Sequence, residues 1–355
     1  MNMSAFFHNN RKVSYLLILS ALVISSCSST TTNPPTPSYG TTYLVSDMAG
    51  FGASRIDAGL LNPWGIAVMS DGSFWISVNH DSSGFNYNTG GQNVIGSVSI
   101  PLPGAVTGGS PSGAIVNSTT NGDFKGAKVI YCTEDGIIAT WTSGTKAVQV
   151  TQPTDSMELK GLAIGNDGGA NFIYATDFKE DKIVVYNNNF TLTVKTLADV
   201  SIPSGISGYG PFGIQNINGL LYVTYARHKP FPDNGDDLAQ AGTGYIDVFN
   251  PNGTLIKHFA SAGTLNSPWG IAAAGAGFGL YKNDILISNF GDGRINAYDT
   301  SGTYLGQLSN SSGSPIAIDG LWGISFNTVT ADNYLYFTGG PNGENHGTFG
   351  YIKGQ

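Results

Sequence analysis

The stretch Asn62-Pro63-Trp64-Gly65-Ile66-Ala67 returns later in the chain as Asn266-Ser267-Pro268-Trp269-Gly270-Ile271-Ala272, and a close variant reads Gly320-Leu321-Trp322-Gly323-Ile324-Ser325. Weaker copies complete a series of aligned glycines: Gly65, Gly113, Gly161, Gly213, Gly270 and Gly323. Six copies at intervals of 48 to 57 residues indicate a repeat architecture, and this period suits a blade of four strands. The repeat therefore predicts an all-β, six-bladed β-propeller with four antiparallel strands per blade.

The fifth repeat illustrates the strands expected in each blade. The apolar run 269–274 follows a proline turn and is predicted to form the inner strand, and 284–289 the second strand. Residues 294–299 alternate polar and apolar side chains, as a half-exposed third strand should, and 304–308 complete the blade. No helix of consequence is predicted.

The last repeat has too few residues to supply its own fourth strand. We expect residues 42–46 to provide it, so that the two ends of the propeller join in one blade. Closure of this kind removes the open edge that a free outer strand would leave.

The first 40 residues are predicted to be an address and a tether rather than part of the fold. Arg11 and Lys12 precede an apolar run at 13–24, which is typical of a secretory signal and too short for a comfortable membrane span. The following Ile-Ser-Ser-Cys27 resembles the lipobox of bacterial lipoproteins, which implies cleavage after residue 26 and acylation of Cys27. An ordinary signal peptide with an incidental cysteine is the alternative.

This reading divides the chain into a signal peptide (1–26), a lipid anchor with a flexible linker (27–40) and the propeller (41–355). The linker is rich in Ser, Thr and Pro and carries no charge. Ser28 replaces the aspartate that marks inner-membrane retention in the resembling signals, so secretion across the inner membrane and anchoring in the outer membrane are expected.

Composition argues against nucleic acids and anionic lipids as partners and against stabilisation by an internal disulfide. With 16 Lys and Arg against 24 Asp and Glu, the net charge of −8 disfavours nucleic-acid binding, which depends on neutralising phosphates. Because Lys and Arg are few, we also expect no basic patch that could bind anionic lipid headgroups. Once Cys27 is acylated, Cys132 is the one cysteine left, so no internal disulfide can form.

Propeller geometry directs scarce polar residues to one mouth of the central channel, because the inner strand starts where the second strand ends. The candidates for ligand binding there are Trp64, His80, Lys160, Arg227, Trp269 and Trp322. The candidates for holding a metal ion, calcium in particular, are the oxygen-bearing residues Asn79, Glu134, Asp177 and Asn289. The candidates for acid–base chemistry are His228, His346 and Glu344.

These residues also have structural interpretations, which the sequence leaves open. The Trp-Gly pairs are suited to packing one blade against the next. Asn79, Asp177 and Asn289 recur at equivalent strand ends, where Asn and Asp often close turns onto backbone amides.

Several segments carry a resemblance to a known family. The quoted repeats, together with 132–141, 287–299 and 339–350, resemble a family of secreted bacterial six-bladed propellers without an established activity, over about Tyr43 to Tyr351. More distantly, the fold looks like NHL-repeat and TolB-type propellers. That wider group includes binding modules, lactonases and streptogramin-type lyases, so the resemblance alone does not choose a function.

Three hypotheses follow. The first is a lipid-anchored binding or scaffold module whose mouth takes a glycan, a peptide or an envelope protein. The second is a calcium-dependent hydrolase or lyase of the lactonase or streptogramin-lyase type; glycosidic cleavage by Glu134 and Glu344 is a variant. The third is a purely structural envelope protein.

Overall fold

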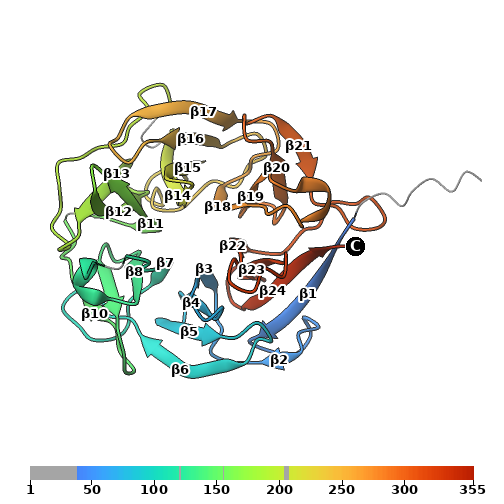
Figure 1. Cartoon of the computed structure of the whole chain (residues 1–355), viewed down its shortest axis with the longest axis horizontal. Coiled ribbons are helices and arrows are strands. Elements are labelled where there is room, and N and C mark those ends of the chain that lie inside the picture. Colours follow the sequence, from blue (N-terminus) through green and yellow to red (C-terminus); the bar gives the residue numbers. More distant parts are fainter. Residues whose placement is uncertain (1–37, 120, 155, 204–207) are drawn as a thin grey trace, which may run out of the picture. The chain divides into compact units, whose positions relative to one another are not determined.

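The computed structural model describes residues 38–119, 121–154, 156–203 and 208–355. The predicted signal peptide and Cys27 lie outside these residues, as does the linker as far as residue 37. The described residues form six β-sheets arranged around a central axis, which confirms the predicted six-bladed propeller (Figure 1).

The first three blades follow one another along the chain, each with its earliest strand next to the axis. Their strands are β3 (Pro63–Val68), β4 (Phe74–Val78), β5 (Ser83–Tyr87) and β6 (Asn93–Ser99) in blade one; β7 (Pro111–Val116), β8 (Val129–Thr133), β9 (Ile138–Trp141) and β10 (Val148–Gln149) in blade two; and β11 (Leu159–Asp167), β12 (Ala170–Asp177) and β13 (Lys182–Asn187) in blade three. Within the described part of blade three, an isolated bridge from Tyr186 to Leu192 stands where the other blades have a fourth strand.

Blades four to six repeat the pattern. Their strands are β14 (Tyr209–Ile217), β15 (Leu220–Arg227), β16 (Tyr245–Phe249) and β17 (Leu255–Ser261) in blade four; β18 (Pro268–Ala273), β19 (Ile285–Asn289), β20 (Ile295–Tyr298) and β21 (Tyr304–Gln307) in blade five; and β22 (Leu321–Phe326), β23 (Leu335–Gly339), β24 (Thr348–Gly354) and β1 (Tyr39–Ser46) in blade six. The short β2 (Arg55–Ile56) runs parallel to β1 at the edge of blade six.

The ring closes through the first strand. β1 pairs antiparallel with β24 from Tyr39 opposite Gly354 to Ser46 opposite Thr348. The strand begins three residues before the predicted start at Thr42, because Tyr39 is buried beside Phe278 and Tyr281 and donates a hydrogen bond to the Phe278 carbonyl. Strand β1 therefore also takes in two residues that the sequence assigned to the linker.

Helices contribute little. Among the described residues, the two helical segments, Asp123–Gly126 and Gly279–Tyr281, are single 3₁₀ turns. Within the described ranges, none of the helices has the length and hydropathy to cross a bilayer.

The aligned glycines lie where the inner strands of neighbouring blades touch. A Cβ on Gly65 would lie 2.5 Å from the Ala114 amide nitrogen of blade two, and one on Gly323 would lie 2.5 Å from the Trp64 carbonyl oxygen of blade one. All six glycines line a narrow cavity of about 40 Å³ on the axis. The glycine repeat is thus explained by close backbone approach between blades, and the axis is nearly filled at this level.

A hydroxyl group on the second strand joins each of several glycines to the next blade. Thr176 accepts a hydrogen bond from the Gly161 amide at 2.7 Å and donates one to the Phe212 carbonyl of blade four at 2.9 Å. Ser77, Ser288 and Thr338 do the same for Gly65, Gly270 and Gly323. In blade two the buried Cys132 stands near this position, and Ser112 donates instead to the Leu159 carbonyl at 2.6 Å.

We expect Thr176→Val to lower the free energy of unfolding by about 2–4 kcal/mol, because the buried Gly161 amide and Phe212 carbonyl each lose a partner at roughly 1–3 kcal/mol. Valine keeps the shape of the side chain, so packing changes little. Denaturant unfolding measures the loss. The matched control is Thr300→Val, an exposed turn residue, which should change stability by no more than about 0.5 kcal/mol. Equal effects at the two sites would contradict the role assigned to the hydroxyl.

Candidate functional site

A cavity of about 500 Å³ opens at one mouth of the channel, on the side where the inner strands begin. We call it the mouth pocket. Its lining includes five residues that the sequence placed at this mouth as candidates for binding or acid–base chemistry: Trp64, His80, Lys160, Trp322 and Glu344. Two candidates for metal binding, Asn79 and Glu134, also line it.

The floor of the mouth pocket is aromatic. Trp64 stacks on Trp322 with ring centroids 3.6 Å apart, and Phe290 stacks on the other face of Trp322 at 3.9 Å. Trp322 is fixed further by a hydrogen bond from its indole nitrogen to Asn62 Oδ1 at 3.2 Å. Because both tryptophans are buried, the half-buried Phe290 is the ring best placed to meet a ligand.

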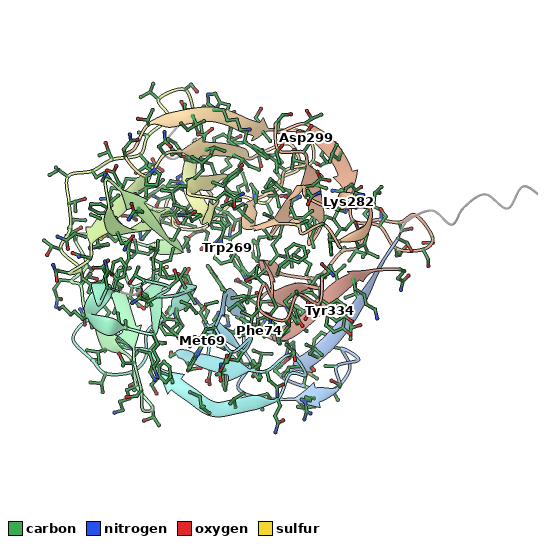
Figure 2. All side chains as sticks on the ribbon, in the orientation of Figure 1. Met69, Phe74, Trp269, Lys282, Asp299 and Tyr334 are labelled. Atoms are coloured by element: carbon green, nitrogen blue, oxygen red, sulfur yellow. The ribbon has the colours of Figure 1, made fainter. Side chains whose placement is uncertain are left out.

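Trp269 lies below this floor. It lines the narrow axial cavity rather than the mouth pocket, near the centre of the ring (Figure 2). It meets Trp64 and Trp322 edge to face, at centroid distances of 6.1 and 5.6 Å. Its contacts therefore fit the packing role that the sequence left open for the Trp-Gly pairs.

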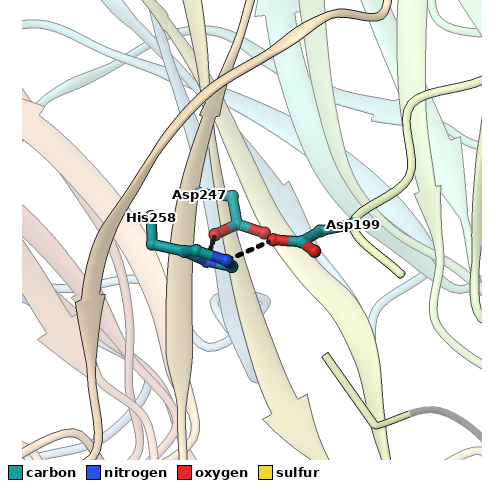
Figure 3. Close-up of side chains that lie close together, drawn as sticks. All are labelled: Asp199, Asp247 and His258. Atoms are coloured by element: carbon teal, nitrogen blue, oxygen red, sulfur yellow. Dashed lines mark hydrogen bonds and ion pairs between the residues drawn. The ribbon is translucent and has the colours of Figure 1, made fainter. Parts of the chain in front are cut away.

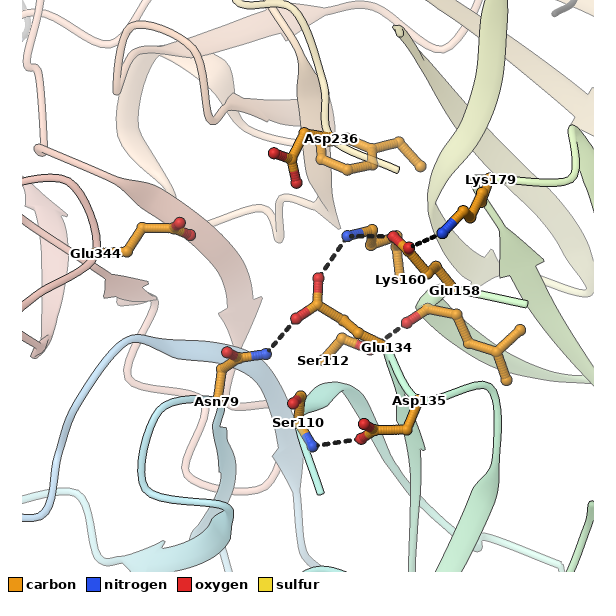
Figure 4. A network of polar contacts seen from close by, with 12 residues as sticks. Asn79, Ser110, Ser112, Glu134, Asp135, Glu158, Lys160, Lys179, Asp236 and Glu344 are labelled. Atoms are coloured by element: carbon orange, nitrogen blue, oxygen red, sulfur yellow. Dashed lines mark hydrogen bonds and ion pairs between the residues drawn. The ribbon is translucent and has the colours of Figure 1, made fainter. Parts of the chain in front are cut away.

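One wall of the pocket is a chain of charges that crosses blades one to three (Figure 4). Lys160, whose side chain is only 3% exposed, donates to Glu134 at 2.5 Å and lies 3.7 Å from Glu158. Glu134 also accepts a hydrogen bond from Asn79 at 2.8 Å. Burial alone would lower the pKa of Lys160, but the charge and hydrogen bond of Glu134 outweigh burial and raise it. Lys160 is therefore a permanent cation beneath the pocket.

The opposite wall carries carboxyl groups on loops. Glu344, between β23 and β24, accepts a hydrogen bond from Asn62 at 3.3 Å. Burial raises the pKa of Glu344, and the nearby charge of Glu134 raises it further. Asp236 and Asp237 reach the pocket from the loop between β15 and β16. Burial also raises the pKa of Asp237.

Three other candidates do not reach the pocket. His228 is buried against Phe178, where its Nε2 lies 2.6 Å from Asp181 and its Nδ1 lies 2.8 Å from the Asn234 carbonyl. His346 pairs with Asp47 at 2.7 Å. Arg227 ends β15 and contacts Gln240 at 3.5 Å. Each of these side chains is turned to a partner outside the pocket lining, so the structure does not bring them together, and their predicted roles in binding and acid–base chemistry remain predictions.

The four residues expected to hold calcium do not converge. Asn289 is buried; it donates to the Thr264 carbonyl at 2.8 Å and accepts from the Asn266 amide at 3.2 Å. Asp177 accepts from the Glu158 amide at 3.1 Å and faces Lys182 at 3.6 Å, and burial raises its pKa to about 6. The structure thus brings Asn79 and Glu134 together and places Asp177 and Asn289 elsewhere, so calcium binding by this set remains a prediction. Both residues have the turn-closing role that the sequence left open.

The pocket also contains residues that sequence reasoning missed. Phe290 directly follows a second strand, so the rule that placed His80 and Glu134 at this mouth could have found it. Asp236 and Asp237 belong to the acidic segment 233–237, which lacks the spacing of a known calcium loop. The loop between β15 and β16 follows a second strand, so the strand-end rule places it at this mouth, but the rule does not single out these two side chains.

Comparison with known proteins places the chain among relatives. No family model matches it. It is 36% identical to the uncharacterised protein R648 of Acanthamoeba polyphaga mimivirus over 312 residues, which is 83% of this chain and 75% of the relative. It is 32% identical to the uncharacterised protein L690 of the same virus over 300 residues, or 80% and 77% of the two chains.

The chain belongs to the family of these mimivirus proteins. The resemblance seen in the sequence implied a bacterial family, whereas the relatives found are viral. Both relatives are uncharacterised, so membership of this family does not indicate an activity for the site.

Solved structures of similar fold are more distant in sequence. A protein of unknown function from Bacteroides thetaiotaomicron has a TM-score of 0.59 at 13% identity, covering 90% of this chain and 77% of that one. Virginiamycin B lyase from Staphylococcus aureus has a TM-score of 0.53 at 15% identity, and the match covers 90% of this chain and 99% of the lyase. The gluconolactonase XC5397 from Xanthomonas campestris has a TM-score of 0.53 at 14% identity, and the match covers 83% of this chain and 88% of the gluconolactonase. At these identities the likeness shows the fold alone.

Proposed function

We propose that this propeller is a binding module whose mouth pocket takes a small ligand rich in hydroxyl groups, such as the terminal sugar of a glycan. The observation that carries the proposal is that one pocket combines an aromatic floor with a wall of carboxyl groups. Glu344, Asp236 and Asp237 offer acceptors to hydroxyl groups, and Phe290 offers a ring to an apolar sugar face. A volume of about 500 Å³ suits a ligand of one or two sugar rings.

The proposal includes presentation of this pocket at a membrane. It is supported by the basic start, the short apolar run and the position of Cys27. In this scheme residues 1–26 are removed, acylated Cys27 anchors the chain in the outer membrane of the cell envelope, and the uncharged linker holds the propeller clear of the lipid. Cys27→Ser should move the protein from the membrane fraction to the soluble fraction.

A second candidate is an acid–base hydrolase or lyase that uses the same pocket. A carboxyl group with a raised pKa is suited to donate a proton, and Glu344 is such a group beside the ion-paired Glu134. Similarity of fold to a lyase and a gluconolactonase is compatible with this candidate. Because the predicted calcium ligands do not converge, no step of this scheme is assigned to a metal ion.

The backbone at Glu344 makes a clean test possible. Its φ of +68° lies in the left-handed region, where a glutamate is strained and glycine is not. Glu344→Gly therefore removes the carboxyl group and relieves the strain, whereas Glu344→Ala removes the carboxyl group and keeps the strain. We expect the glycine variant to be at least as stable as the alanine variant, by up to about 1 kcal/mol.

The experiment is a glycan array followed by calorimetric titration of the best sugar into the wild-type protein and both variants. We expect saturable binding to the wild type and at least a tenfold loss in both variants, independent of their stabilities. Turnover of lactones or glycosides that disappears in both variants would favour the enzyme. Neither binding nor turnover in the wild type would contradict both candidates.

A further inference from the structure

A second cluster of ionisable side chains lies in the outer part of blade four, among residues that do not line the mouth pocket. Asp247 on β16 and His258 on β17 are direct cross-strand partners. Asp199 reaches them from the segment that follows blade three, so that the imidazole faces both carboxyl groups (Figure 3). The cluster therefore joins two parts of the chain that are far apart in sequence.

The contacts within the cluster are short. His258 Nδ1 lies 2.8 Å from Asp247 Oδ1, and His258 Nε2 lies 2.9 Å from Asp199 Oδ2. The hydroxyl of Ser201 is also 2.9 Å from Nε2. One potential ligand atom from each of the three residues lies within 4.8 Å of the other two. A single ion would bind one imidazole nitrogen, and the aspartate that now faces the other nitrogen would shift toward the ion to complete the three ligands.

Burial makes the acidic pair costly without a cation. The side chains of Asp247 and Asp199 are 0% and 4% exposed. Asp247 Oδ2 is buried and has no hydrogen-bond partner among the described residues. Desolvation raises the pKa of Asp247 to about 6. Buried charges in proteins are normally paired or bound to metal ions, and a lone imidazole is a small counterweight to two carboxylates.

We propose that Asp199, Asp247 and His258 form a binding site for a divalent transition-metal ion such as Zn²⁺. One imidazole nitrogen with two carboxylate oxygens is a donor set that suits Zn²⁺, whereas Ca²⁺ takes six to eight oxygen ligands. Water or the Ser201 hydroxyl completes a four-coordinate shell. His258 is 52% exposed, which gives the ion a path from solvent to the buried carboxylates. The bound ion ties the segment after blade three to the outer strands of blade four.

Calorimetric titration of ZnCl₂ into the metal-stripped protein at pH 7.5 tests this site. We expect one ion per chain and a rise in Tm on loading. His258→Gln and Asp247→Asn should each weaken binding at least tenfold. Co²⁺ bound in place of Zn²⁺ should give a visible absorption band that both variants lose.

The matched control is His346→Gln, since His346 also contacts a carboxylate, Asp47, at 2.7 Å but has no second carboxylate partner in the described part of the chain. This variant should keep full Zn²⁺ affinity. The proposal is overturned if the wild type binds no Zn²⁺ saturably, as expected if His258 is a cation held by the two aspartates. It is also overturned if His258→Gln and Asp247→Asn bind Zn²⁺ as tightly as the wild type.

Discussion

Replacing Gly213 with alanine is expected to prevent the six blades from closing properly. The new Cβ would overlap the carbonyl oxygen of Trp269 on the neighbouring inner strand and lie 2.8 Å from its carbonyl carbon. Both obstacles are backbone atoms, so no side chain can rotate away. Overpacking in a core costs about 1–3 kcal/mol where side chains can adjust, and we expect at least about 3 kcal/mol here. A closed ring gives little room for relief, because moving one blade outward strains both of its neighbours.

Thermal unfolding measures this effect. A loss of that size corresponds to a fall in Tm of roughly 4–5 °C or more, and much of the variant should be insoluble on expression. Gly275→Ala is the control, since a Cβ there meets its nearest neighbour, Asn333 Oδ1, at 3.9 Å and φ lies outside the left-handed region. Similar Tm values for the two variants would show that the inner strands are not in tight backbone contact.

Breaking the Lys160–Glu134 ion pair in the wall of the mouth pocket is expected to cause the second large loss of stability. Glu134→Leu leaves Lys160 buried, with only Glu158 at 3.7 Å as a carboxylate partner. Breaking a buried ion pair costs about 3–5 kcal/mol. Because Glu134 is 26% exposed, we expect the lower part of that range, about 3 kcal/mol. Lys160→Met should cost less, since the Glu134 left behind reaches water and keeps its hydrogen bond from Asn79.

A double-mutant cycle tests the asymmetry. The variant with both substitutions should be more stable than Glu134→Leu alone, because no buried charge is left unpaired. Chemical denaturation of the wild type, both single variants and the double variant provides the four free energies. Strictly additive losses of stability would mean that Lys160 and Glu134 are not energetically coupled, which would contradict the ion pair assigned to this wall of the pocket.

The fold was predictable because its cause is local and repeated. Each aligned glycine allows the next blade to approach closely, and because this requirement recurs in every blade, the glycine recurs six times in the sequence. The closing strand was predictable for a related reason, since the last repeat is visibly short of residues. The start of β1 was misplaced because burial of Tyr39 depends on Phe278 and Tyr281, which are distant in sequence.

The site was predictable only in part. The rule that strand ends meet at one mouth placed Trp64, His80, Lys160 and Glu134 correctly around the pocket. It failed for His228, because the rule gives a position and not the direction of a side chain, and Asp181 holds this imidazole elsewhere. His258 was not among the candidates from the sequence, because its contact with Asp199 joins segments far apart in the chain and leaves no local pattern.

The pairing of β1 with β24 has a consequence for biosynthesis. The strand that is made first has its antiparallel partner at the opposite end of the chain. Until that partner emerges, β1 presents unpaired backbone groups, and an incomplete chain cannot finish blade six. Contacts between such distant segments form slowly, because the whole intervening chain must be ordered first. Completion of the ring therefore requires that the chain has been made as far as β24, and a chain cut short before β24 keeps an unpaired strand edge of the kind that favours aggregation.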